Sequence, residues 1–99
     1  MILIVRGIII ITLVVYFMDQ DKHPALVQLG RNIRNYREEK GISQEELAHE
    51  AGLDRTYVGG AERGERNLTV LSLMKISKPL KVDLADLVDG VAEADKSGS

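Results

Sequence analysis

The stretch that decides the fold is QEELAHEAGLDRTYVGGAER, residues 44–63. Its centre, Gly52-Leu53-Asp54, predicts a tight turn between two short helices, because glycine adopts positive φ easily and aspartate caps a following helix. Small and apolar residues recur on both sides at helical spacing, and those expected to face inward are Leu47, Ala51, Val58 and Ala61. This arrangement has the spacing of a DNA-binding helix-turn-helix.

Helix start signals of one kind recur along the chain. Each is a polar N-cap residue preceded by an apolar residue that can pack onto the first turn, a pattern typical of helix N-termini. The four caps are Ser43, Asp54, Thr69 and Asp83. An earlier helix is predicted to begin at Pro24 and to end at Gly41, because glycine is the preferred residue for a C-cap with left-handed backbone. Together the signals predict an all-α domain of five helices over residues 24–90.

Two boundaries are expected near the C-terminus. Pro79 disfavours helical backbone at the residue before it, so the fourth helix is expected to end at Lys78. Gly90 is expected to close the fifth helix. Residues 91–99, VAEADKSGS, carry too little apolar surface to order themselves, which predicts a disordered acidic tail.

Residues 1–17 differ in composition from everything that follows. Up to Met18 the chain is apolar except for Arg6, Gly7 and Thr12. One interpretation is a translation start at Met18, and a second is a membrane anchor, although a span needs roughly 20 apolar residues. A third is a packed strand or dimer segment. No small-residue cleavage site follows, which argues against a secretory signal.

The net charge of −2 is unevenly distributed. Residues 22–81 hold eleven Lys and Arg against eight Asp and Glu, whereas residues 82–99 hold five acids against Lys96 alone. A mildly basic body indicates weak non-specific DNA binding with a strong dependence on salt. The absence of cysteine fits a reducing cytoplasm, and His23 and His49 alone make no zinc site, so we expect no metal and no cofactor.

Residues 29–88 resemble the Cro and phage-repressor type of helix-turn-helix regulators, the Xre-like family, and within it the controller proteins of restriction-modification systems. The most specific matches are YREEKGISQEELA, residues 36–48, and LDRTYVGGAERGERNLT, residues 53–69. The resemblance implies a λ-repressor-like five-helix domain that acts as a dimer on a palindromic operator, with its own promoter as one candidate, and performs no catalysis. Pro79, Leu68 and the apolar leader depart from the family pattern.

The front of the second helix of the motif is expected to read bases in the major groove. Arg55 is the best candidate for guanine, because its planar fork matches O6 and N7. Thr56 suits a thymine methyl or a phosphate. Tyr57 offers a ring and a hydroxyl, with packing at the helix edge as the alternative. By resemblance, all three positions lie at the DNA.

Four further residues are candidates for the DNA backbone. Gln44 and Ser43 begin the first helix of the motif, where amide groups and the helix N-terminus favour a phosphate, although the main role of Ser43 is expected to be capping. Arg66 and Asn67 follow the second helix and reach the backbone in similar proteins. For the charged residues around Arg63, a solvated surface is the alternative.

Two features of the motif are not base readers. By resemblance, Arg37 and Glu62 form a partly buried ion pair that ties the first helix to the third. Gly59 and Gly60 each weaken the helix by roughly 0.5–1 kcal/mol relative to Ala. Many phage repressors carry a base-reading side chain at the position of Gly60, so its absence here suggests a closer approach of the backbone to the groove.

A single recognition helix is insufficient for specificity, so a homodimer is expected. The apolar residues assigned to its interface are Val82, Leu84, Leu87 and Val88, with closure of their own core as the alternative. For the acidic side chains of the second helix there are two interpretations, a contact with RNA polymerase and a solvent-exposed face, and the exposed face is favoured. The alternative functions are a membrane-tethered regulator, if the leader is genuine, and an antitoxin or protein-interaction module.

Overall fold

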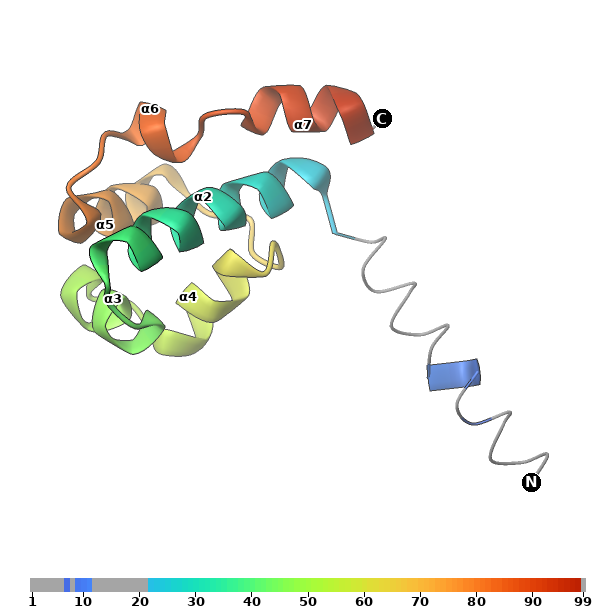
Figure 1. Cartoon of the computed structure of the whole chain (residues 1–99), viewed down its shortest axis with the longest axis horizontal. Coiled ribbons are helices and arrows are strands. Elements are labelled where there is room, and N and C mark those ends of the chain that lie inside the picture. The colour runs from blue at the N-terminus through green and yellow to red at the C-terminus, as the bar shows by residue number, and fades with distance from the viewer. Residues whose placement is uncertain (1–6, 8, 12–21, 99) are drawn as a thin grey trace.

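The computed structural model describes residues 7, 9–11 and 22–98, and within the last of these ranges all regular structure is helical. The helices are α2 (Pro24–Lys40), α3 (Gln44–Ala51), α4 (Arg55–Glu62), α5 (Val70–Leu80), α6 (Leu84–Leu87) and α7 (Val91–Gly98), as Figure 1 shows. The predicted all-α fold is therefore confirmed, and a sixth helix, α7, is added to the expected five.

The helix boundaries follow from the predicted caps. Ser43 Oγ accepts from the Glu46 amide at 3.0 Å, and the Glu46 carboxylate accepts from the Ser43 amide at 3.4 Å, which completes a capping box. Thr69 Oγ1 accepts from the Ser72 amide at 3.1 Å at the start of α5. Gly41 ends α2 with a φ of 73°, a left-handed conformation that glycine adopts without strain.

The core lies where α2 to α6 meet. Each of these helices contributes one large side chain that is fully buried, namely Ile33, Leu47, Val58, Ile76 and Leu87. The long helix α2 packs against α4, α5, α6 and α7, with α3 and α4 on one side of it and α6 and α7 on the other (Figure 1). The motif helix α4 is therefore held by the central helix α2, and α3 is held by α4 and α5.

A glycine on α2 sets the distance to α4. A β-carbon at Gly30 would lie 2.5 Å from the carbonyl oxygens of both Ala61 and Glu62. These are backbone atoms, so no side-chain movement relieves the clash. Only glycine lets the two helices approach this closely, and the close contact fixes the orientation of α4 on the domain.

The expected end of the fourth helix at Lys78 is wrong, because α5 continues through Pro79 to Leu80. Leu80 is 6 % exposed and belongs to the core, so packing overrides the local preference of the residue before proline. Lys81 then adopts φ 59° and ends the helix. Pro79 lies in the last turn, where its missing amide removes a single helical hydrogen bond.

The expected disordered tail over 91–99 is also wrong for residues 91–98, which form α7. Val91 packs against the core, and α7 lies along α2 (Figure 1). Asn32 Nδ2 donates to the carbonyls of Leu87 at 2.8 Å and Asp89 at 2.7 Å, which fastens the segment before α7 to α2. Tertiary contacts with α2 supply the burial that the short tail lacks by itself.

Most of the apolar leader, residues 1–17, lies outside the described residues, and so do the interpretations of it as a membrane anchor or a packed strand. Within it, Ile9, Ile10 and Ile11 are described and exposed. Among the helices that the structure describes, none is both long enough and apolar enough to cross a membrane.

Candidate nucleic-acid interface

The two helices of the motif, α3 and α4, meet at the predicted turn. Gly52 has a φ of 68°, and the following amide, that of Leu53, donates to the Ala48 carbonyl at 2.9 Å. Leu53 packs against the core from the angle between the helices. The turn therefore has the geometry that the sequence predicts for residues 52–54.

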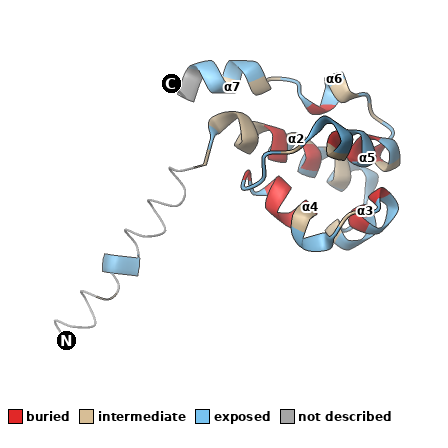
Figure 2. Ribbon diagram, turned by 180° about the vertical axis from the view of Figure 1, so that it is seen from behind, coloured by how far each residue is buried: buried red, intermediate tan, exposed pale blue. Residues whose placement is uncertain are grey.

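The first turn of α4 is exposed, and the rest of the helix is buried (Figure 2). Arg55 and Thr56 lie in this exposed turn, while residues 58–62 are buried. The helix thus presents its N-terminal end to solvent and anchors its C-terminal end in the domain. This is the orientation that a recognition helix needs in order to place its front in a groove.

Asp54 holds the exposed turn in shape. Its carboxylate accepts from the Thr56 amide at 2.8 Å. Hydrogen bonds from the side chain and the amide of Thr56 lower the pKa of this carboxyl, and Arg66 adds a smaller electrostatic contribution in the same direction. At neutral pH the cap is therefore ionised and tightly hydrogen-bonded.

Tyr57 is half-buried and makes contacts within the protein. Its hydroxyl donates to Ser72 Oγ at 3.2 Å, which links α4 to α5. The guanidinium carbon of Arg66 lies 5.7 Å from the centre of the Tyr57 ring, within the range of a cation–π contact. Tyr57 is thus packed at the helix edge in the free protein, and Ser72 is a partner that sequence reasoning missed.

Gln44 does not extend its side chain into solvent. Its amide Nε2 donates to Glu62 Oε1 at 3.0 Å, which joins the start of α3 to the end of α4. Ser43 is exposed and is engaged in the capping box of α3. In the free protein both residues hold the motif together.

Arg37 and Glu62 form a two-pronged ion pair between α2 and α4. Arg37 Nε lies 2.6 Å from Glu62 Oε2, and Nη2 lies 3.0 Å from Oε1. The Glu62 side chain is only 2 % exposed, and that of Arg37 is 12 % exposed. Arg37 Nη1 also donates to the Ile42 carbonyl at 2.9 Å. The hydrogen bonds that Arg37 donates to Glu62 raise the pKa of Arg37 above its ordinary value, so the guanidinium stays charged.

The two glycines of α4 are buried rather than open. A β-carbon at Gly59 would lie 3.1 Å from Arg63 Nη1 and 3.4 Å from Gln44 Oε1. One at Gly60 would lie 3.0 Å from Arg66 Nε. Arg66 and Asn67, beyond the end of α4, are both exposed. The sequence predicted a close approach of the backbone to the DNA groove at Gly60, and in the free protein Arg66 lies over this position.

The expected dimer residues do not share one environment. Leu87 is fully buried in the core, so its assignment to an interface is wrong. Val82 and Leu84 are half-buried and pack against the core, whereas Val88 is 41 % exposed. The most exposed large apolar side chains of the described domain lie instead at the start of α5, where Val70 is 64 % and Leu71 69 % exposed.

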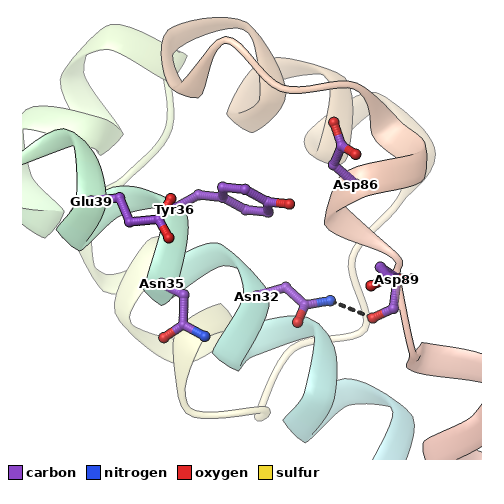
Figure 3. Close-up of a pocket in the computed structure, with 6 residues that line it drawn as sticks. All are labelled: Asn32, Asn35, Tyr36, Glu39, Asp86 and Asp89. Atoms are coloured by element: carbon purple, nitrogen blue, oxygen red, sulfur yellow. Dashed lines mark hydrogen bonds between the residues drawn. The ribbon is translucent and has the colours of Figure 1, made fainter.

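A small pocket lies on the other side of the domain, between α2 and α6 (Figure 3). Its lining residues are Asn32, Asn35, Tyr36, Glu39, Asp86 and Asp89. Partial burial, together with nearby carboxylates, raises the pKa of the Tyr36 hydroxyl. Because its charged residues are acidic, the pocket does not suit a phosphate, and it contains none of the residues predicted to bind DNA.

Known proteins share both the sequence and the fold. A helix-turn-helix family model matches residues 33–87. The chain is 43 % identical over 60 residues to Control protein C.SmaI of Serratia marcescens, covering 61 % of this chain and 71 % of that protein. It is 46 % identical over 61 residues to Control protein C.BamHI of Bacillus amyloliquefaciens, covering 61 % and 75 %.

A solved structure gives the same result. The restriction-modification controller protein C.AhdI from Aeromonas hydrophila superposes with a TM-score of 0.62 at 45 % identity, covering 63 % of this chain and 94 % of that one. The family model spans the helix-turn-helix and the core helices around it. The chain therefore belongs to the helix-turn-helix family, as an Xre-like transcriptional regulator of the controller-protein type.

Proposed function

We propose that this regulator binds a palindromic operator as a homodimer, with the front of α4 in the major groove, and that one such operator lies upstream of its own gene. The observation that carries the proposal is the exposed first turn of α4, with Arg55 and Thr56 free of the core and held by the Asp54 cap. The proposed role is recognition of DNA and involves no catalysis.

Within this proposal, the residues differ in which part of the DNA they contact. Arg55 and Thr56 contact bases, because they lie at the N-terminal end of the recognition helix. Arg66 and Asn67 contact the sugar-phosphate backbone from the exposed segment after α4. Ser43 and Gln44 approach a phosphate through the N-terminus of α3, and Tyr57 contributes through its ring edge.

The second subunit is proposed to bind through α5. Val70, Leu71 and Met74 are 64 %, 69 % and 40 % exposed. Met74 lies four residues after Val70 and three after Leu71, so it is next to both on the helix surface. An exposed apolar face next to a DNA-binding motif is what a two-fold partner would cover. Val88, at the C-terminal end of α6 and 41 % exposed, remains the alternative interface residue on a different face.

The experiment is footprinting and quantitative binding on the DNA upstream of the gene, at two salt concentrations. A protected palindrome is expected, and Arg55→Ala should weaken binding by about 1–3 kcal/mol without altering the melting temperature. Arg34→Ala is the matched control, since it removes an exposed arginine of α2 that pairs with Glu38 outside the motif. No protected site, or equal losses in the two variants, would contradict the proposal.

A further inference from the structure

Arg66 lies lengthwise across the surface of α4 at Gly60. A β-carbon on Gly60 would lie 3.1 Å from Arg66 Cγ, 3.6 Å from Cδ and 3.0 Å from Nε, three consecutive atoms of that side chain. Contacts at 3.0–3.1 Å are tighter than most real β-carbon contacts, so an alanine here would push the arginine away from α4 by a few tenths of an ångström. Gly60 is buried, although its neighbour Arg66 is exposed.

The end of the same side chain lies against Tyr57. Its guanidinium carbon is 5.7 Å from the ring centre, and Tyr57 lies three residues before Gly60, so both are on one face of α4. The ring is itself held by the hydrogen bond from its hydroxyl to Ser72 Oγ. The Glu65 amide donates to the Gly60 carbonyl at 2.9 Å and holds the turn that carries Arg66.

We infer that Gly60 is a positioning residue for DNA binding, because its missing side chain leaves a space for Arg66 on the surface of α4, which we call the seat. In the seat Arg66 packs against α4 and Tyr57 and is positioned to contact the DNA backbone. The inference rests on the proposed function. An arginine that is already held loses less conformational freedom when it contacts a phosphate. This replaces the interpretation that Gly60 lets the DNA approach more closely, because Arg66 covers it.

The seat is tested first without DNA, by the NMR chemical shift of the Arg66 Nε–H group near the Tyr57 ring. Gly60→Ala should shift this resonance toward the position that it has in Tyr57→Leu. Gly59→Ala is the matched control, because it makes the same change one residue earlier against Arg63 and Gln44 and should leave the Arg66 resonance in place. An unchanged resonance in Gly60→Ala would overturn the inference.

Folding is measured on the same variants. Gly60→Ala should keep or raise the melting temperature, because the new methyl group meets only a flexible side chain and alanine favours the helix. Should this variant fail to fold, the double variant Gly60→Ala/Arg66→Ala decides the matter. Recovery of folding in the double variant supports the seat, and continued unfolding contradicts it.

Binding to operator DNA is then compared in a double-mutant cycle. Arg66→Ala should weaken binding about tenfold and lower the salt slope by about 1. Gly60→Ala should cause part of this loss on its own and change affinity less than about twofold when Arg66 is already absent. If Gly60→Ala lowered operator affinity equally in the presence and in the absence of Arg66, the inference would be overturned. The result would favour a close approach of the DNA to Gly60 itself. If the wild-type chain bound no operator, the proposed function would fail, while the resonance would still report on the seat.

Discussion

At the scale of single residues, the pair of Arg37 and Glu62 links three helices around the motif. Glu62 receives three hydrogen bonds, two from Arg37 on α2 and one from Gln44 on α3. Its carboxylate is almost fully buried at the end of the recognition helix. One buried charge therefore ties α2, α3 and α4 together, and its energetic effect depends on both partners being present.

Arg37→Ala should destabilise the domain by about 3–5 kcal/mol, because it leaves the Glu62 carboxylate buried with only Gln44 as a partner. The measurement is urea denaturation of the full chain. Arg34→Ala is the control, since its pair with Glu38 on the same helix has side chains that are 63 % and 54 % exposed. That loss should be far smaller than the loss in Arg37→Ala, because exposed ion pairs contribute little to stability. Similar losses in the two variants would show that burial of the Glu62 carboxylate contributes little.

The residues of the candidate site were predictable to different degrees. Arg55 and Thr56 follow from the motif alone, because the front of the second helix of a helix-turn-helix is the end that enters the groove. The contact of Tyr57 with Ser72 could not be predicted, since it joins residues of different helices. For the same reason the sequence predicted that the Gln44 side chain faces the DNA, whereas in the structure its amide donates to Glu62 inside the protein.

At the scale of elements, the close approach of α2 and α4 depends on Gly30. Gly30→Ala should destabilise the domain by about 3 kcal/mol or more, because the new β-carbon would lie 2.5 Å from backbone oxygens of α4. It should also weaken operator binding, since α4 must move away from α2. Denaturation and DNA titration measure the two effects.

Gly59→Ala is the control for this prediction. It introduces the same methyl group into a helix, but the nearest atom is the end of a flexible arginine at 3.1 Å. The change in stability should therefore stay within about 1 kcal/mol of zero. A stabilised Gly30→Ala variant would mean that the two helices separate freely.

The helix starts were predictable because their signals are local, and the ends that failed depend on packing. A cap such as Ser43 is defined by its own next three residues. The extension of α5 through Pro79 requires Leu80 to find its place in the core, and α7 requires a surface on α2. Neither partner surface is visible in the segment itself, so the sequence predicted a shorter helix and a disordered tail.

At the scale of the whole molecule, the distribution of apolar side chains separates the core from the candidate interface. Leu87 and Leu71 are both leucines of the C-terminal helices, yet one is fully buried and the other is 69 % exposed. The sequence assigned Leu87 and Val88 to the interface because both lie in an apolar stretch. Apolar character alone does not say which side of a helix faces its own domain.

Leu71→Asp should therefore dissociate the proposed dimer and leave the subunit folded, because a carboxylate replaces an apolar side chain that touches no core. The dimer dissociation constant should rise at least about 30-fold, as expected at the centre of an interface. Sedimentation over a range of concentrations measures it, with stability compared at a concentration where both proteins are monomeric. Operator affinity should fall with the loss of the dimer, since each subunit then holds a single half-site.

Two further variants locate the interface. Leu87→Ala should lower stability by about 2–5 kcal/mol through a cavity in the core, without a specific effect on association. Val88→Asp tests the face that the sequence favoured, at the C-terminal end of α6 rather than on α5. If Val88→Asp separates the subunits and Leu71→Asp does not, the subunits meet through the C-terminal end of the domain. The two recognition helices would then have a different separation, and footprinting would show a different spacing of half-sites.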